Sequence, residues 1–202
     1  MNPFGTVPCI YDGDRGVFES AVCMEYIDEK FPTDGLKLFP GDAVTRASIR
    51  AFISTLDFKP IYGYIMEQDR TKDASHAAAC DALMAAIETK YSAASPAGPF
   101  FLGAELSAAD IAVFPFLDRM VPGLRTYRGY DLWGSGGGTA YPRLKAAWDA
   151  IQTRPAWRAT QQSEEYYVAA YQGYATGKPG TVPKRVKAAS PDASKFPATA
   201  SM

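Results

Sequence analysis

The stretch GTVPCIYDGDRGVFES, residues 5–20, decides which folds the chain can adopt. It contains a short strand pattern, a turn around DGD, a shorter strand pattern and the start of a helix at Ser20. This order predicts a β-hairpin followed by a helix. Two strands and one helix are too few to form a stable layer on their own. We therefore expect the hairpin to belong to a larger sheet.

A helical pattern follows the hairpin over residues 20–31, SAVCMEYIDEKF. Four of its side chains share one face and are predicted to be buried: Val22, Cys23, Tyr26 and Ile27. The sequence PTDG then ends the helix, and residues 36–41 have the composition of a linker. The first domain is therefore predicted to end at residue 35.

The sequence beyond the linker predicts helices. Asp42 is placed to cap the first of them, and residues 73–94 form another, with apolar residues three and four positions apart. In FFLGAELSAADIAVFPFLDRM, Ser107 and Asp110 have the S-x-x-D spacing of a capping box. This spacing predicts that a further helix begins at this point.

The glycine-rich segment at residues 122–140, which includes GSGGGT, predicts a loop. Phosphate-binding loops are also rich in glycine, but they follow a strand and end in Gly-Lys-Ser/Thr, and this segment has neither feature. A flexible connector is therefore the favoured interpretation. Helices resume at Pro142, and Pro155 begins a last helix that is predicted to end near Gly173.

The composition is that of an ordinary globular protein. Of the 202 residues, 47% are apolar and 21% are charged, and the net charge of −1 gives no general attraction to nucleic acid or to an anionic membrane. No apolar run approaches the roughly 20 residues of a membrane span, and no signal-peptide pattern opens the chain. Residues 175–202 carry five basic residues against one acidic residue and predict a disordered basic tail.

Cysteine and histidine offer little for metal binding or nucleophilic catalysis. Cys9, Cys23 and Cys80 are widely spaced and form no CxxC pair, metal cluster or disulfide framework. Cys23 and Cys80 lie on apolar helix stripes, where free cysteines are commonly buried. His76 is the only histidine, so the sequence does not favour a catalytic Ser/His/Asp or Cys/His arrangement. We predict no metal site and no catalytic residue within the chain.

Three motifs, in this order, resemble the cytosolic glutathione transferase family. NPFGTVPCIYDGDRGVFESAVCMEYIDEKFP resembles the second half of its thioredoxin-like domain, FFLGAELSAADIAVFPFLDR resembles the core helix of its all-helical domain, and YPRLKAAWDAIQTRPAW resembles the two helices that follow. The resemblance covers residues 2–170. CMEYIDEKFP, and YRGYDL before YPRL, are most similar to the omega and lambda branches, which use a catalytic cysteine.

The resemblance implies an α+β fold. Residues 1–35 would be the C-terminal half of a thioredoxin-like, glutathione-binding domain, and residues 42–174 an all-α glutathione-transferase C-terminal domain. In the family, a strand–helix–strand unit that carries the catalytic residue precedes NPFG. Only Met1 precedes NPFG here, so we expect that unit and its cysteine to be encoded upstream.

The resemblance also implies a glutathione site at the hairpin. Pro8 is expected to be cis, so that the backbone N–H and C=O of Val7 can pair with the cysteinyl unit of glutathione as an added strand would. Ser20 and the N–H groups at the start of the helix are expected to bind the γ-glutamyl carboxylate, and Glu19 to face the ammonium group of the ligand. In the structural alternative, Ser20 is a plain N-cap.

The position of a second substrate is left open between two interpretations. Tyr62, Tyr64 and Met66 are expected either to line a pocket between the two domains or to pack in the core.

The expected function is that of a cysteine-type glutathione transferase, with glutathione as co-substrate and a small electrophilic or disulfide compound as the other substrate. Thiol transfer, deglutathionylation and dehydroascorbate-like reduction are all compatible with this chemistry. The 202 residues alone are expected to show little or no activity. One alternative is a non-catalytic interaction module of the same fold, and another is a degenerate product whose helical domain folds alone. The family implies a cytoplasmic homodimer without nucleic-acid or membrane partners.

Overall fold

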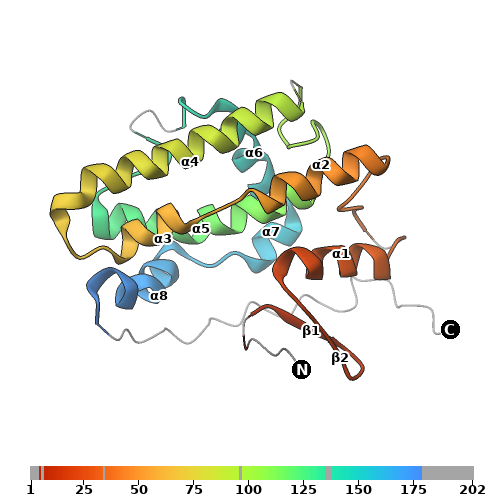
Figure 1. The fold of residues 1–202 in the computed structure, drawn as a ribbon, viewed down its shortest axis with the longest axis horizontal. Helices are drawn as coiled ribbons and strands as arrows, with labels where there is room; N and C mark the ends of the chain where they lie inside the picture. Colours follow the sequence, from red (N-terminus) through yellow and green to blue (C-terminus); the bar gives the residue numbers. More distant parts are fainter. Residues whose placement is uncertain (1–4, 6, 34, 96, 135–137, 179–202) are drawn as a thin grey trace.

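The computed structural model describes residues 5, 7–33, 35–95, 97–134 and 138–178 (Figure 1). A hairpin of β1 (Cys9–Asp12) and β2 (Arg15–Phe18) leads into α1 (Ser20–Lys30). The rest of the described chain is helical: α2 (Ala43–Ser54), α3 (Lys59–Met66), the 3₁₀ helix η1 (Arg70–Lys72), α4 (Asp73–Ala94), α5 (Ala108–Arg128), α6 (Pro142–Gln152), α7 (Pro155–Thr160) and α8 (Glu164–Thr176). The predicted α+β class is confirmed.

The hairpin is an antiparallel pair in which Cys9 lies opposite Phe18. At its other end, the Asp12 carboxylate accepts a hydrogen bond from the Tyr26 hydroxyl (2.8 Å) and pairs with the Lys30 ammonium group (3.0 Å). Tyr26 and Lys30 are one turn apart on α1 and therefore reach the same carboxylate. These contacts tie the turn of the hairpin to α1.

One apolar face of the N-terminal region is exposed. Val7 is 91% exposed, Val22 52% and Ile27 43%. The prediction that Val22 and Ile27 are buried is therefore wrong, and the buried residues of α1 are Cys23 and Asp28. The helical period located the helix correctly. However, an apolar helix face is buried only where another element packs on it, and no element among the described residues covers Val22 and Ile27.

Polar contacts join α1 to the helical body. Arg50 of α2 makes two hydrogen bonds to Glu25 of α1, from Nε to Oε1 (2.9 Å) and from Nη2 to Oε2 (3.1 Å). The buried Asp28 accepts from the backbone N–H of Leu38 (2.6 Å) and pairs with Lys37 (2.8 Å). Because a bidentate pair fixes orientation as well as distance, these contacts set the direction of α1 against α2.

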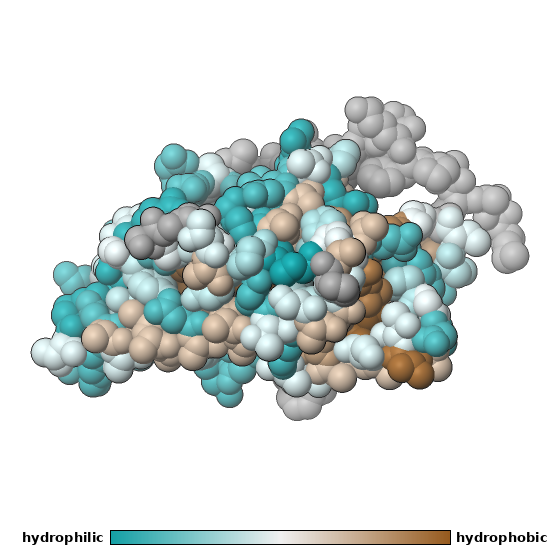
Figure 2. Space-filling view, turned by 90° about the horizontal axis from the view of Figure 1, so that it is seen from above, coloured by the Kyte–Doolittle hydropathy of each residue, from teal (hydrophilic) through white to brown (hydrophobic). Residues whose placement is uncertain are grey.

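α5 is the centre of the helical body, and Figure 1 shows it passing through the middle of the ribbon with α4 above it and α8 below. Twelve of its residues are buried, on all sides of the helix, as expected for a helix enclosed by others. In the view from above (Figure 2), the surface is largely hydrophilic, and the strongest hydrophobic colour gathers toward the end that carries α1 and α2.

A buried carboxylate fixes the start of α5. Asp110 Oδ2 accepts from the backbone N–H (2.9 Å) and the hydroxyl (3.0 Å) of Ser107. Asp110 Oδ1 accepts from the backbone N–H of Phe101 (2.9 Å) and from the hydroxyl of Tyr91 (3.0 Å). The predicted capping box is confirmed, and the same carboxylate also joins the preceding loop to α4. Burial raises the pKa of Asp110, although its four donors oppose that rise.

α5 is longer than predicted. It continues through Pro122 to Arg128, so the loop predicted over residues 122–140 is wrong at its start. Pro122 removes one backbone hydrogen bond, but the residues from Met120 to Leu124 are buried, and this packing outweighs the loss. Gly129 follows the last helical residue and ends the helix with a φ of 63°, which glycine adopts readily. Part of the glycine-rich run lies outside the described residues.

The single last helix predicted after Pro155 is in fact two, α7 and α8. The Gln161 amide donates to the Asp118 carboxylate of α5 (3.0 Å), and Ser163 caps α8 by accepting from the Tyr166 N–H (3.2 Å). A serine cap offers the backbone an alternative to a continuous helix. α8 ends at Thr176, so it extends two residues into the segment predicted as tail, most of which lies outside the described residues.

We predict that Asp110→Ala lowers the free energy of unfolding by about 3 kcal/mol or more, because it leaves several buried donors without an acceptor. Urea denaturation followed by circular dichroism measures the change. The matched control is Asp149→Ala, which removes an exposed carboxylate paired with Lys145 and is expected to cost about 0.5 kcal/mol or less. Equal losses for the two variants would contradict the role given to Asp110.

Candidate functional site

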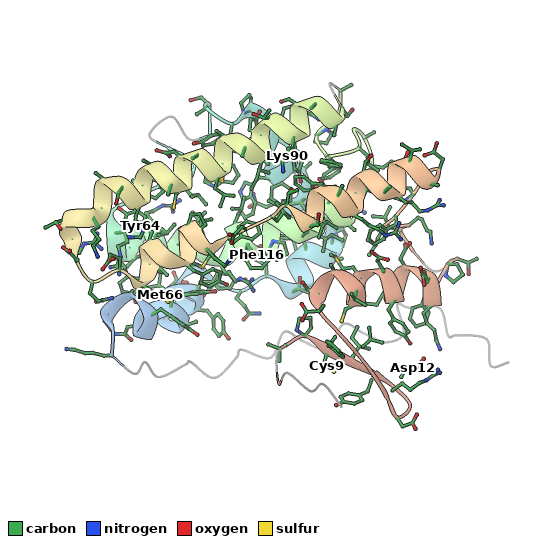
Figure 3. All side chains as sticks on the ribbon, in the orientation of Figure 1. Cys9, Asp12, Tyr64, Met66, Lys90 and Phe116 are labelled. Atoms are coloured by element: carbon green, nitrogen blue, oxygen red, sulfur yellow. The ribbon has the colours of Figure 1, made fainter. Side chains whose placement is uncertain are left out.

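The four predicted binding residues lie at one end of the hairpin. Because Cys9 pairs with Phe18, the segments just outside this pair, Val7–Pro8 and Glu19–Ser20, lie at the same end of the two strands. Figure 3 shows Cys9 at the end of the hairpin near the start of α1, and Asp12 at the other end. The Val7–Pro8 peptide bond is cis, as the resemblance implies. All four residues are exposed, so together they form an open surface.

The start of α1 leaves backbone donors available at this surface. The N–H of Cys23 donates to the carbonyl of Glu19 (2.8 Å), so the N–H groups of Ser20, Ala21 and Val22 precede the first helical hydrogen bond. No side chain among the described residues caps this end. Free N–H groups and the positive end of the helix dipole favour an anion here.

Glu19 has an unusual backbone conformation, with φ of 70° and ψ of 125°. It is the one non-glycine residue with positive φ in the part of the chain that the structure describes. Such conformations are uncommon for residues with a side chain and are concentrated at functional sites. Sequence reasoning missed this feature because glutamate at this position carries no signal for positive φ.

The cysteines are poorly suited to act as nucleophiles. Cys23 is 5% exposed, its thiol lies 3.4 Å from the Val17 carbonyl oxygen, and burial raises its pKa. Cys80 is fully buried in α4, and burial raises its pKa to about 12. A thiol with a raised pKa has little thiolate near neutral pH, and the thiolate is the reactive form. Cys9 is half-buried on β1.

The aromatic residues of α3 are divided between core and surface. Tyr64 is buried and stacks on His76, with 5.6 Å between the ring centroids. Tyr62 packs edge-on against Phe116 of α5, and Met66 is 46% exposed. Figure 3 shows Tyr64, Met66 and Phe116 along α3 and the middle of α5. Core packing, one of the two expectations, therefore describes Tyr64.

A cavity of about 550 Å³ lies between α5, α7 and the start of α8. Its apolar lining consists of Leu106, Ile111, Pro115, Ala156, Ile151 and Trp157. Its polar lining includes Asp118, Arg119, Arg154, Gln161 and Tyr167. The sequence did not indicate this cavity, because the break between α7 and α8 that opens it was predicted as continuous helix. None of Val7, Pro8, Glu19 and Ser20 lines it.

Asp118 is the acidic group of this cavity. It is 9% exposed, and burial raises the pKa of its carboxyl. Both oxygens have donors: Oδ1 accepts from the Gln161 amide (3.0 Å) and Oδ2 from the Tyr167 hydroxyl (2.7 Å). Asp118 therefore joins α5 to the segment between α7 and α8 through Gln161 and to α8 through Tyr167.

The comparison with known families decides the identity of the fold. The model of the glutathione S-transferase C-terminal domain matches residues 48–160, more than half of the chain. The chain belongs to the glutathione S-transferase family.

Three known proteins are similar to this chain. Glutathione S-transferase F9 of Arabidopsis thaliana is 26% identical over 176 residues, which cover 79% of this chain and 75% of that protein. A stringent starvation protein A homolog of Pasteurella multocida is 31% identical over 126 residues, 59% of this chain and 55% of that protein. The solved structure of glutathione transferase Omega 3C from Trametes versicolor superposes with a TM-score of 0.69 at 28% identity, covering 86% of this chain and 71% of that one.

The described residues hold no cluster of three or more His, Cys, Asp or Glu side chains that could bind a metal ion. Nor is any described helix of this transferase-family chain both long and apolar enough to cross a membrane.

We predict that at most one thiol per chain, that of Cys9, reacts rapidly with Ellman's reagent in the native protein, because Cys23 and Cys80 are buried with raised pKa values. All three should react in guanidinium chloride. The control is Cys9→Ser, which should have no rapidly reacting thiol. Two or more rapidly reacting thiols in the native protein would contradict the burial of Cys23 and Cys80.

Proposed function

We propose that the protein is a cysteine-type glutathione transferase that catalyses thiol transfer, such as deglutathionylation or dehydroascorbate-like reduction. The observation that carries this proposal is the meeting of the Val7–Pro8 segment and the uncapped start of α1 at one end of the hairpin. The similarity to an omega transferase structure supports the cysteine-type branch, and so does the CMEYIDEKFP motif.

Glutathione binds along this end of the hairpin in the proposal. The backbone N–H and C=O of Val7 pair with the cysteinyl unit of the tripeptide as one more strand would. The γ-glutamyl carboxylate accepts from the Ser20 hydroxyl and from the N–H groups at the start of α1. The Glu19 carboxylate faces the ammonium group of the ligand. An open surface suits this role, because a tripeptide bound as an extra strand needs no deep cavity.

The reaction proceeds through a mixed disulfide. An enzyme thiolate attacks the glutathione sulfur of a mixed disulfide, the other sulfur leaves as a thiolate and takes up a proton, and glutathione stays bonded to the enzyme. The thiolate of a second glutathione then attacks the glutathione sulfur that is bonded to the enzyme. This step forms glutathione disulfide and restores the enzyme thiolate.

We propose that this thiolate comes from a strand–helix–strand unit that precedes the hairpin in the whole protein. Two observations support this. Cys23 and Cys80 are buried with raised pKa values, and the exposed Val22 and Ile27 form an apolar face that such a unit would cover. The 202 residues alone would then bind glutathione without turning it over. We also propose a cytoplasmic homodimer for the whole protein.

The alternative is a non-catalytic interaction module with the same fold. The similarity to a stringent starvation protein A homolog, which is not named as a transferase, favours it. The two functions differ in whether the surface at Ser20 binds glutathione.

We predict that the chain is retained on immobilised glutathione and that Ser20→Ala weakens this binding about tenfold or more, through loss of a hydrogen bond to a charged group. Elution with free glutathione measures the retention. The matched control is Ser48→Ala on α2, where the hydroxyl donates to the Val44 carbonyl (3.0 Å), and it should be retained like the wild-type chain. Absence of retention, or equal retention of both variants, would favour the interaction module.

The coding sequence before Met1 provides a second test. A continuous reading frame that encodes strand, helix and strand, with a cysteine at the start of that helix, is the expected result. A stop codon directly before Met1 would contradict the proposed origin of the thiolate.

A further inference from the structure

A second cavity, of about 280 Å³, lies further along α5 than the first, between α5, α6 and the start of α8. The linings of the two cavities share Asp118, Gln161, Gln162 and Tyr167 and otherwise consist of different residues. The volume of the second cavity is just below the roughly 300–1,000 Å³ of small-molecule sites. A ligand of this cavity is therefore a single small ring rather than a larger body.

Arg125 of α5 stands between two carboxylates at this cavity without a direct hydrogen bond to either. Its guanidinium nitrogens are 3.8 Å from Asp131 Oδ2 and 3.7 Å from Glu164 Oε1. Both distances exceed the roughly 2.7–3.2 Å of an N–H···O hydrogen bond. The side chain of Arg125 is 48% exposed, so its donors are open to a ligand from solvent. A hydroxyl group fits this arrangement, because it accepts from a guanidinium group and donates to a carboxylate at the same time.

The side-chain amides of Gln152 and Gln162 add open acceptors to the lining. Their Nε2 atoms donate to the backbone carbonyls of Trp148 (3.3 Å) and Thr160 (3.4 Å), respectively. Their Oε1 atoms accept no hydrogen bond from any residue that the structure describes. Further hydroxyl groups of a ligand can donate to these oxygens.

Two tryptophans form an aromatic wall of the cavity. Trp148 of α6 is half-buried, and the buried Trp133 packs against it with 5.7 Å between the ring centroids. The face of an indole ring carries the negative part of its quadrupole and attracts groups with a partial positive charge. The C–H groups of a sugar ring are of this kind, because each ring carbon is bonded to oxygen. A sugar therefore matches the wall as well as the polar groups.

The charges of the lining are already offset, which disfavours an ionic ligand. Arg125 lies between Asp131 and Glu164. Lys145 pairs with both carboxylate oxygens of Asp149, at 2.6 and 2.7 Å. A carboxylate or ammonium group on a ligand would have to compete with one of these pairs. A neutral hydroxyl group joins them without displacing a charge.

We propose that this cavity binds a neutral sugar ring in the pyranose form. One face of the ring lies on Trp148. Its hydroxyl groups bridge Arg125 to the neighbouring carboxylates and donate to the Gln152 side chain. The inference is independent of the function proposed above, because the surface at Ser20 shares no residue with this cavity.

The test is a titration of the isotope-labelled 202-residue chain with methyl β-D-glucopyranoside, in which NMR spectra follow the indole N–H signals of the three tryptophans. We expect saturable binding, with the largest shift at Trp148. The comparison probe is 2-methoxytetrahydropyran, which has the same ring without hydroxyl groups. It should bind about tenfold or more weakly, because it offers no hydroxyl group to the charged side chains.

Arg125→Met should weaken binding of the glucoside about tenfold or more, through loss of hydrogen bonds to a charged group. The matched control is Arg70→Met. Arg70 is also partly exposed and paired with a carboxylate, that of Asp73, but it is outside the cavity lining. The control variant should bind the glucoside like the wild-type chain.

Absence of saturable binding, equal affinity for the two probes, or an unchanged affinity in Arg125→Met would overturn the proposal. A largest shift at Trp157 would also overturn it, because Trp157 lines the other cavity and not this one. If Arg125→Met does not fold, Glu164→Ala and Gln152→Ala take its place, and an unchanged affinity in both overturns the proposal equally. Retention on immobilised glutathione tests the proposed function separately.

Discussion

The buried Asp110 carboxylate is the contact on which the rest of the structure depends. It accepts from Ser107, Phe101 and Tyr91, and so joins the start of α5, the loop before it and α4 at one point. A charged or polar group with no water around it is tolerated only when its bonds are complete, which makes the arrangement specific as well as stable. Helices α2, α3 and α8 pack on α5, Tyr91 joins α4 to it, and α1 also contacts it.

The two candidate sites use this frame in different ways. The surface at Val7–Pro8 and Glu19–Ser20 is built from backbone groups and a helix end, which suits a peptide-like ligand with a carboxylate. The cavity beside α5 is built from side chains, and its lining combines apolar residues with Asp118, Arg119 and Arg154. α1 contacts α5, and residues of α5 also line the cavity. The same helix therefore contacts both regions.

The exposed apolar face at Val22 and Ile27 links structure to the proposed chemistry. A two-stranded sheet with one helix is marginal alone. Here α1 is held by ionic contacts such as Glu25–Arg50 and by Met24, which packs against the core of the helical body. Surface ion pairs contribute little stability but fix orientation when they are bidentate. The N-terminal region is thus held in one orientation against α2, while an apolar surface stays uncovered in the described chain.

The sequence by itself determined the local structure: the hairpin around DGD, the capping box of Ser107 and Asp110, the helix at residues 73–94 and the family that these motifs resemble. These features depend on neighbours a few residues apart, which periodicity and cap chemistry report directly. Only the tertiary structure decided what depends on distant residues. It extended α5 through Pro122 because the surrounding packing outweighs one lost hydrogen bond. It also left Ile27 exposed and paired the Asp118 carboxylate with Gln161 and Tyr167, because burial and pairing are set by elements far apart in the chain.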